Sequence, residues 1–314
     1  CAEILLDNKQ QCNLTTVNLA AFATDQGFDE EGALKAQALS ARAGLRMTLV
    51  DLELPEWDFI HKRDRLTGCS LTGVMDAIGA WPSQRQEKLL ARLAQQARQT
   101  AAQYAAKLRI QSPLLVTTVK PEGTLSLVAG GVSPGLHDAH APFFIRRVRI
   151  SADDALAKVA LVHGWPIHPE VGTPDNKLEH ARTLVIDFPV RSGALRTKED
   201  VPALAQLERY LMFQRSYTDH NSSNTITVRP EEWAGLAQAI ADHWDDFAGV
   251  SFLALDGGTY QLAPYEAITR EQYEQLRDRA MPFDPRVLQL YEGTGLSELD
   301  GEDPDCATGG CPAR

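Results

Sequence analysis

The sequence lacks both a long apolar run and an excess of positive charge. No stretch reaches the ~18 apolar residues that a membrane span requires, and no basic segment followed by an apolar one opens the chain. Acidic residues outnumber basic residues by 42 to 31, which gives a formal net charge of -11. A chain of this charge has little general attraction for a nucleic-acid backbone or an anionic membrane. We therefore expect a cytoplasmic protein that binds neither, and in which any bound nucleotide needs a dedicated pocket.

Cysteine is scarce, and the number of cysteines is odd. The chain contains Cys1, Cys12, Cys69, Cys306 and Cys311. Such a count in a long chain argues against the disulfide framework of a secreted protein, so we expect thiols that are reduced at rest. Cys69 lies in Gly-Cys-Ser-Leu-Thr-Gly and is expected to be a small buried side chain.

The last two cysteines form a motif of their own. Cys306 and Cys311 are separated by Ala-Thr-Gly-Gly and follow an acidic stretch without apolar periodicity. Such a segment is expected to be mobile, and its glycines permit the turn that brings two cysteine Cα atoms to the ~5.5–6 Å of a disulfide. A zinc site needs four ligands, and no histidine or further cysteine stands nearby. We predict that residues 294–314 form a mobile redox tail rather than a metal site.

Histidines give no metal motif either. His137, His140 and His220 are scattered beside predicted loops, without the paired spacing of a metal site, so we predict no metal in the chain. The polar run from His220 to Thr225 can line a ligand cavity, without an assigned role.

What is present is the composition and periodicity of an α/β protein. Apolar residues make up 44% of the chain and charged residues 23%, which is typical of globular proteins. The length suits about two domains or one large α/β unit. Apolar and β-branched runs predict strands, and helical spacing predicts helices between them, so we expect an α/β fold with substantial parallel character. The predicted strands are 114–119, 143–150, 183–188, 225–228 and 250–253, and the predicted helices are 28–52, 83–108, 153–163, 201–215, 231–247 and 270–280.

A glycine-containing turn follows the uncharged strand 114–119. Its sequence, Lys-Pro-Glu-Gly-Thr-Leu-Ser at 120–126, includes Gly123, which has no Cβ to block a ligand from the backbone. Exposed backbone N–H groups at such a turn can bind phosphate oxygens, with Thr124 and Ser126 as further donors. The same residues also suit an ordinary turn with a helix cap, and they are not a P-loop. A second glycine-rich loop at 130–137 can close over a ligand.

The opening residues place a thiol beside a carboxylate. In an extended segment, Cys1 and Glu3 lie on the same face, which brings a base close to a sulfur. The alternative is a buried cysteine and a solvent-facing glutamate on unrelated turns.

Taken together, the motifs resemble the C-terminal half of ribonucleotide reductase over essentially the whole chain. The residues that carry the resemblance are Cys-Ala-Glu-Ile-Leu-Leu at 1–6, Cys-Asn-Leu at 12–14, Gly-Cys-Ser-Leu-Thr-Gly at 68–73, the 120–126 turn, Ser-Pro-Gly-Leu-His at 133–137, Ile-Arg-Arg-Val-Arg at 145–149 and the terminal Cys-x4-Cys. Within the family, the chain is most similar to the adenosylcobalamin-dependent class, and in particular to its monomeric ribonucleoside-triphosphate reductases. The tandem tyrosines of the iron-dependent class and the glycyl-radical motif of the oxygen-sensitive class are both missing from the sequence.

The resemblance implies a fold and a cofactor. Residues 1–293 would form the second half of a ten-stranded α/β barrel, with peripheral helices. Adenosylcobalamin would generate a thiyl radical on Cys1, which abstracts the 3′ hydrogen of a ribonucleotide. Glu3 matches the carboxylate that removes the 3′-hydroxyl proton, and Cys12 matches one of two thiols that supply reducing equivalents.

The resemblance also implies partners. The second redox cysteine would lie in the N-terminal half of the same enzyme, and the Cys306/Cys311 tail would reduce the resulting disulfide and pass the oxidation to thioredoxin. The turn matches the family's substrate-phosphate site, with Pro121, Glu122, Gly123, Thr124 and Ser126 as its residues. The expected substrate is a ribonucleoside triphosphate.

Departures from the family and two alternatives accompany this interpretation. The family's Asn-Pro before the radical cysteine is not in the sequence, and neither are the first strands, the second redox cysteine and most of the allosteric and cofactor-binding surface. The chain alone is therefore expected to be catalytically silent. Cys1 itself can arise from processing or protein splicing. The alternatives are the large subunit of an iron-dependent reductase, and a thiol-disulfide redox module without radical chemistry.

Overall fold

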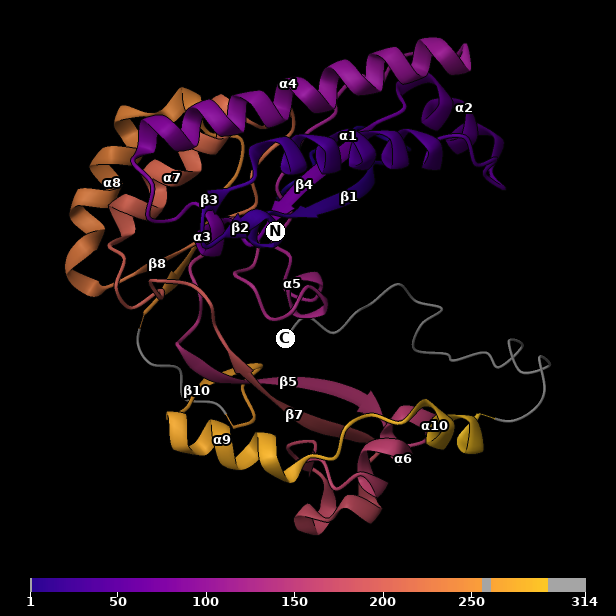
Figure 1. Ribbon diagram of the computed structural model, residues 1–314, viewed down its shortest axis with the longest axis vertical. Coiled ribbons are helices and arrows are strands. Elements are labelled where there is room, and N and C mark those ends of the chain that lie inside the picture. Colours follow the sequence, from indigo (N-terminus) through magenta and orange to yellow (C-terminus); the bar gives the residue numbers. More distant parts are fainter. Residues whose placement is uncertain (1, 256–260, 293–314) are drawn as a thin grey trace. The chain divides into compact units, whose positions relative to one another are not determined.

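The structure, a computed structural model, describes residues 2–255 and 261–292. These residues form two compact units (Figure 1). The first contains residues 2–145, 190–255 and 265–273, and the second contains residues 146–189, 261–264 and 274–292. The predicted tail 294–314 lies outside the described residues.

Parallel strands form the centre of the first unit. β1 (Asn13–Asn18) pairs in parallel with β4 (Thr67–Thr72), so that Asn13 lies opposite Thr67. The next segment, 115–119, runs parallel to β4 through a bridge between Cys69 and Thr117, and a bridge between Val119 and Ser222 continues the array. β8 (Thr225–Val228) follows directly and pairs in parallel with β9 (Ser251–Ala254). The order is therefore β1, β4, 115–119, 221–228 and β9.

β4 lies in the interior of this array because its residues are small. All six are buried, and backbone N–H groups of Thr67 and Cys69 donate to Leu115 and Val116 on the neighbouring segment. A Cβ at Gly68 would lie 2.3 Å from the Leu14 side chain. The side chains of Leu14 and Thr118 therefore occupy the space that a side chain at position 68 would need.

Two long helices lie side by side in the first unit (Figure 1). α1 (Glu30–Met47) begins at Asp29, whose carboxylate accepts a hydrogen bond from the Gly32 N–H. α4 (Ser83–Leu108) buries a stripe of residues three or four apart that pack toward α1: Leu89, Leu90, Leu93, Ala94, Ala97, Ala101 and Ala105. Small side chains in the second half of this stripe allow close helix packing.

Shorter elements complete the first unit. They are β2 (Ala23–Thr24) and β3 (Gly27–Phe28), which form a small antiparallel pair, α2 (Pro55–Asp64), α3 (Val74–Ala77), α5 (Leu125–Val128), α7 (Ala203–Ser216), α8 (Trp233–Asp242) and β10 (Tyr265–Ala267). No helix within the described residues is both long and apolar enough to cross a bilayer.

The second unit is built on a sheet of a different kind. β5 (Phe143–Ser151), β7 (Thr183–Arg191) and β6 (Ile167–Pro169) lie in that order, with β6 antiparallel to β7. α6 (Ala155–Val162) contacts α10 (Pro285–Tyr291), and α9 (Arg270–Arg279) enters this unit at Glu274. Arg147 and Asp187 form a buried ion pair, with 2.9 Å between Nε and Oδ1.

The expected mixture of helices and parallel strands is confirmed. The predicted helix 83–108 and strand 225–228 have the bounds of α4 and β8. Helix 28–52 was predicted too long, because α1 ends at Met47, and helix 231–247 ends early, at Asp242, where a short 3-10 turn follows. β1 and β4 were not predicted.

Candidate functional site

The segment that follows Cys1 is held against the parallel strands by Asn221. Cys1 itself lies outside the described residues. The Asn221 side chain is fully buried, and its Nδ2 donates to the carbonyl of Ala2 (2.7 Å) and to that of Gly249 (2.8 Å). Its backbone N–H donates to the carbonyl of Glu3 at 3.1 Å, and the Thr118 hydroxyl donates to the same carbonyl at 2.9 Å. Ala2 and Glu3 are thus fixed beside segment 115–119, which forms isolated bridges rather than a strand, and beside the residues that lead into β8.

Glu3 and Cys12 are brought together by this arrangement. Cys12 immediately precedes β1 and is partly buried. Burial, with smaller contributions from the nearby Cys69 and Glu3, raises the pKa of its thiol to about 12. The Cys12 sulfur lies 3.7 Å from Nε2 of His220. Cys12 is therefore a protonated thiol near neutral pH, in the neighbourhood of the Glu3 carboxylate.

The predicted phosphate turn begins at the carboxyl end of strand 115–119. Its Glu122 is buried, has a positive φ of 55°, and accepts hydrogen bonds at Oε1 from Thr16 of β1 (2.7 Å) and Ser70 of β4 (2.8 Å). The Ser70 hydroxyl in turn accepts from the N–H of Lys120 at 2.8 Å. Glu122 therefore ties the turn to two neighbouring strands.

Backbone donors remain available in this turn. Among the described residues, the N–H groups of Gly123 and Thr124 have no acceptor, whereas the N–H of Ser126 donates to the Glu122 carbonyl. A Cβ at Gly123 would meet nothing within 4 Å. In parallel α/β sheets, ligands bind outside the carboxyl ends of the strands, where this turn lies.

A cavity of about 300 Å³ adjoins the turn within the first unit. Pro121, Gly123 and Ser126 contribute to its wall, and Thr124 does not line it. Three rings also line it: His140 lies 5.4 Å from Tyr265 and 5.9 Å from Phe144, measured between ring centroids. The Tyr265 hydroxyl donates to the Gly123 carbonyl at 3.3 Å. The aromatic wall and the turn therefore support each other.

Burial disfavours the protonated forms of the two basic side chains that line the cavity, His140 and Lys198. Burial, with a smaller contribution from the nearby Lys198, lowers the pKa of His140 to about 4. Burial also lowers the pKa of Lys198 from its ordinary value. His140 is consequently neutral near pH 7, and it presents a flat aromatic face with polar nitrogens.

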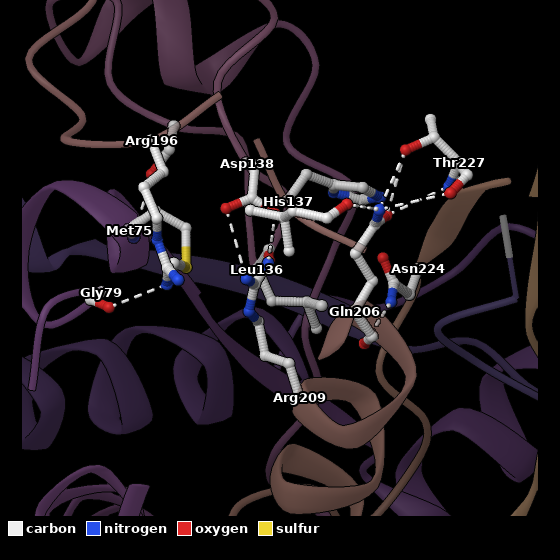
Figure 2. Close-up of polar contacts among 12 residues, drawn as sticks. Met75, Gly79, Leu136, His137, Asp138, Arg196, Gln206, Arg209, Asn224 and Thr227 are labelled. Atoms are coloured by element: carbon white, nitrogen blue, oxygen red, sulfur yellow. Dashed lines mark hydrogen bonds and ion pairs between the residues drawn. The ribbon is translucent and has the colours of Figure 1, made fainter. Parts of the chain in front are cut away.

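Side chains of α7 and of the 136–138 loop hold the far wall of the cavity (Figure 2). Arg209 forms a buried, two-pronged ion pair with Asp138, with distances of 2.7 and 3.2 Å. Gln206 accepts from the N–H of Thr227 (3.0 Å) through Oε1, and His137 accepts from the N–H of Thr225 (2.9 Å) through Nε2. These bonds fix the edge of β8 that β9 does not cover.

The structure thus brings the predicted residues into two groups. Cys12 lies just before the amino end of β1 and the Glu3 carbonyl lies beside Thr118 and Asn221, whereas the second group lies in the turn that follows segment 115–119: Pro121, Glu122, Gly123, Thr124 and Ser126. At ~3.3 Å per residue, the four-residue step along β1 from Cys12 to Thr16, which holds Glu122, is about 13 Å. Cys306 and Cys311 lie outside the described residues.

Comparison with solved structures defines the class of fold. A crystal structure of a B12-dependent (class II) ribonucleotide reductase matches with a TM-score of 0.77 and 23% identity, covering 94% of this chain and 44% of that one. The α subunit of the class Id ribonucleotide reductase of Actinobacillus ureae matches with a TM-score of 0.52 and 14% identity, covering 82% and 52%. The described residues therefore have the fold of part of a ribonucleotide reductase catalytic chain. No family model matches the sequence.

Curated relatives narrow the class. The adenosylcobalamin-dependent ribonucleoside-triphosphate reductase of Euglena gracilis is 32% identical over 278 residues, 88% of this chain and 36% of that protein. The putative enzyme of the same name from Mycobacterium phage D29 is 28% identical, covering 100% and 46%, and that of Levilactobacillus brevis is 25% identical, covering 100% and 45%. The resemblance expected from the motifs is confirmed. The chain spans less than half the length of these relatives.

His220 and Asn221 were not predicted as site residues and were assigned only to a polar run that can line a ligand cavity. Nothing in their local sequence indicates that His220 contacts Cys12 or that Asn221 contacts Ala2. Their separation from these partners, 219 and 208 residues, explains why no local signal reveals them.

Proposed function

We propose that this chain is the C-terminal half of an adenosylcobalamin-dependent ribonucleoside-triphosphate reductase, acting in the cytoplasm. The observation that carries the proposal is the anchoring of the Ala2–Glu3 segment across the parallel strands, which sets Glu3 near Cys12. The reaction replaces the 2′-hydroxyl of a ribonucleotide by hydrogen, releases water and oxidises two thiols to a disulfide. Relatives with that named activity, aligned over nearly the whole chain, support it.

The edges of the parallel array support the proposed barrel. Within the described residues, β1 pairs only with β4, and β9 pairs only with β8, so each outer strand keeps an edge without a strand partner. An N-terminal half with its own strands would pair with these edges and close the ten-stranded barrel. Closure removes exposed strand edges, which is favourable in any sheet.

Three residues would act on the ribose. Cys1 would carry the thiyl radical and abstract the 3′ hydrogen, and Glu3 would accept the 3′-hydroxyl proton, which assists loss of the 2′-hydroxyl as water. Cys12 would be one of the two thiols that are oxidised. Its raised pKa suits this role, because a protonated thiol can donate both a proton and a hydrogen atom.

The turn would bind the substrate phosphates. Its free backbone donors at Gly123 and Thr124, together with the Ser126 hydroxyl, provide neutral hydrogen bonds to phosphate oxygens. Pro121 and Glu122 would shape the turn, since the Glu122 carboxylate is occupied by Thr16 and Ser70. A triphosphate substrate accords with the names of the relatives.

The cofactor is proposed from the relatives alone. Adenosylcobalamin, when bound, supplies the radical that starts the reaction. The cavity of about 300 Å³ beside the turn suits a nucleoside in size and aromatic lining, but it is too small for a corrin ring. The described residues therefore assign no corrin contact, and no step above depends on one.

Reduction of the active-site disulfide would use the tail. Cys306 and Cys311 would exchange with the oxidised Cys12 pair and then with thioredoxin, and the partner of Cys12 would come from the N-terminal half. Residues 294–314 remain a predicted redox tail, and residues 1–293 a predicted half-barrel.

The test is reduction of CTP and CDP, side by side, by this chain joined to its N-terminal half. We expect dCTP as the main product, only when adenosylcobalamin is present and with no second subunit. Glu3→Gln should abolish product in the same assay while leaving the fold intact by circular dichroism. Turnover without cobalamin, or only with an iron-containing subunit, would favour the iron-dependent class.

A second variant, Cys1→Ser, distinguishes the proposed reductase from the alternative, a thiol-disulfide redox module. If disulfide exchange were the chain's only chemistry, Cys1→Ser would leave its full activity in place. The proposed reductase should instead lose all deoxynucleotide formation in that variant, while exchange at Cys306 and Cys311 continues.

A further inference from the structure

The ring of His220 contacts Cys12 and has a defined tautomer. Its Nε2 lies 3.0 Å from the carbonyl oxygen of Thr67, and because a carbonyl only accepts, Nε2 carries the hydrogen. The same Nε2 lies 3.7 Å from the Cys12 sulfur, so its one hydrogen, which Thr67 accepts, reaches the sulfur only as the longer branch of a three-centre hydrogen bond. Thr67 opens β4 opposite Asn13, the residue after Cys12, so the strand register brings the three groups together.

Hydrogen bonds of the His220 backbone fix the position from which the ring extends. The N–H of His220 donates to the Thr117 carbonyl at 3.1 Å, and its carbonyl accepts from Nε2 of Gln214 at the same distance. The residue is 9% exposed. Its neighbour Asp219 is also fixed, because its carboxylate accepts from the N–H groups of Val116 and Thr117. The nitrogen therefore keeps its place whatever the state of the sulfur.

Among the residues that the structure describes, no other titratable group near Cys12 favours a charged sulfur. The titratable groups that act on Cys12 are Cys69 and Glu3, both of which oppose a thiolate, and Asp219 acts on His220. Burial lowers the pKa of His220, so the ring is neutral and acts as an N–H donor rather than a cation. Among the described residues, His220 is the one hydrogen-bond partner of the Cys12 sulfur.

We propose that His220 is a positioning residue for thiol–disulfide exchange at Cys12, whose Nε2–H steadies the negative charge that develops on the Cys12 sulfur when it leaves a disulfide. The inference rests on the proposed role of Cys12 as a redox thiol. In the step, the thiolate of an external dithiol attacks the sulfur bonded to Cys12. A new S–S bond forms, the old one breaks, its electron pair goes to the Cys12 sulfur, and that thiolate then takes a proton from water.

The first test measures alkylation of Cys12 by iodoacetamide in the intact chain between pH 7.5 and about 9.5. Only the thiolate reacts, and tryptic peptide 10–35 contains Cys12 as its single cysteine. We expect His220→Leu to slow the reaction about tenfold at each pH, as loss of a hydrogen bond to a charged group would. His220→Gln keeps an N–H donor and should restore the rate to within about threefold of the original.

Controls separate this effect from a change of fold. His163→Leu removes another buried histidine, whose ring contacts the Val159 carbonyl in the second unit, and should leave the rate unchanged. Cys69 is fully buried, so its labelling in peptide 66–85 reports unfolding. Equal rates in the original chain and a folded His220→Leu variant would overturn the proposal.

A second readout does not depend on the variants folding. Nitrogen-15 NMR of histidine-labelled chain should show Nε2 protonated in His220, with a resonance that moves when Cys12 is alkylated. A proton on Nδ1 alone would overturn the proposal. Neither readout depends on nucleotide turnover. If His220→Leu slows alkylation but the reconstituted enzyme reduces no ribonucleotide, the proposed function is contradicted, whereas the proposed role of His220 is not.

Discussion

Glu122 lies in the turn that would bind phosphate, yet its carboxylate is turned to Thr16 and Ser70. A negative charge beside a phosphate would weaken binding, and this geometry reduces the conflict, because Thr16 and Ser70 donate to Oε1 and the Lys120 ammonium lies 3.8 Å from Oε2. The residue also has a positive φ, which a side chain tolerates only where its surroundings compensate. Its two hydroxyl donors provide that compensation.

Replacing Glu122 therefore tests whether this residue stabilises the turn rather than binding the substrate itself. Glu122→Ala leaves Thr16 and Ser70 without their acceptor, at a cost of about 1–3 kcal/mol, and should raise the KM for the ribonucleotide in the reconstituted enzyme about tenfold or more. Glu122→Gln keeps an acceptor oxygen, so its KM should be close to that of the original enzyme. The measurement is steady-state kinetics of both variants, and a higher KM in Glu122→Gln than in Glu122→Ala would contradict the assignment.

His140 provides a pH-dependent prediction at the same scale. Its pKa is lowered from 6.5 to about 4 in the folded chain, so the unfolded chain takes up the proton first as the pH falls. The free energy of unfolding should therefore fall between about pH 6.5 and 4, by roughly 1–2 kcal/mol from this partly exposed residue. His140→Phe keeps the ring beside Tyr265 and removes the titration.

Urea unfolding at pH 7.5, 6 and 5 checks the His140 prediction. The fall in stability should be smaller in His140→Phe than in the original chain, though not absent, because burial also lowers the pKa of His137 and His220. Between pH 7 and 8 the two curves should run parallel. An identical fall in both proteins below pH 6.5 would refute the contribution of His140.

At the scale of elements, the contact between α1 and α4 depends on small side chains. Ala101 is buried, whereas its neighbour Ala102 is exposed. Ala101→Leu should push the two helices apart and lower the free energy of unfolding by about 1–3 kcal/mol, as overpacking does. Ala102→Leu adds the same atoms outside the core and should change stability by less than about 0.5 kcal/mol. Thermal or urea unfolding compares the two, and similar losses in both would contradict the packing described.

The same helix explains how far the sequence could predict the elements. α4 was predicted at its observed bounds because its apolar residues recur at helical spacing from Leu89 onward and Pro82 precedes its first turn. β1 and β4 read Asn-Leu-Thr-Thr-Val-Asn and Thr-Gly-Cys-Ser-Leu-Thr, with polar or small residues and no alternation. They are strands because neighbours distant in sequence supply hydrogen-bond partners, and a local pattern cannot encode that.

The candidate site divides in the same way. Cys12, Glu3 and the 120–126 turn carry their chemistry in residue types and spacing, so the sequence could single them out. His220 and Asn221 matter only through the partners that folding gives them, Cys12 and Ala2. A neutral buried histidine and a buried asparagine have no distinguishing sequence pattern.

For the whole molecule, the parallel array sets what the chain can do alone. It provides the turn, Glu3 and Cys12, but the outer edges of β1 and β9 have no strand partner among the described residues. Unpaired strand edges associate readily, and the proposed half-barrel by itself would not exclude water from the proposed radical intermediate. Without the N-terminal half, the chain should therefore have neither a closed barrel nor ribonucleotide reduction.

We expect the chain by itself to reduce no ribonucleotide, and a stoichiometric N-terminal half to restore turnover and raise the urea midpoint, since a partner that binds only the folded state stabilises it by mass action. Glu3→Gln separates the two effects: because its backbone carbonyl still accepts from Asn221 and Thr118, the variant should gain the same stabilisation and yet form no product. Sedimentation, unfolding and product assays on the same mixtures measure all three quantities. Turnover by the lone chain, or stabilisation without any complex, would show that the strand edges are not where the second half docks.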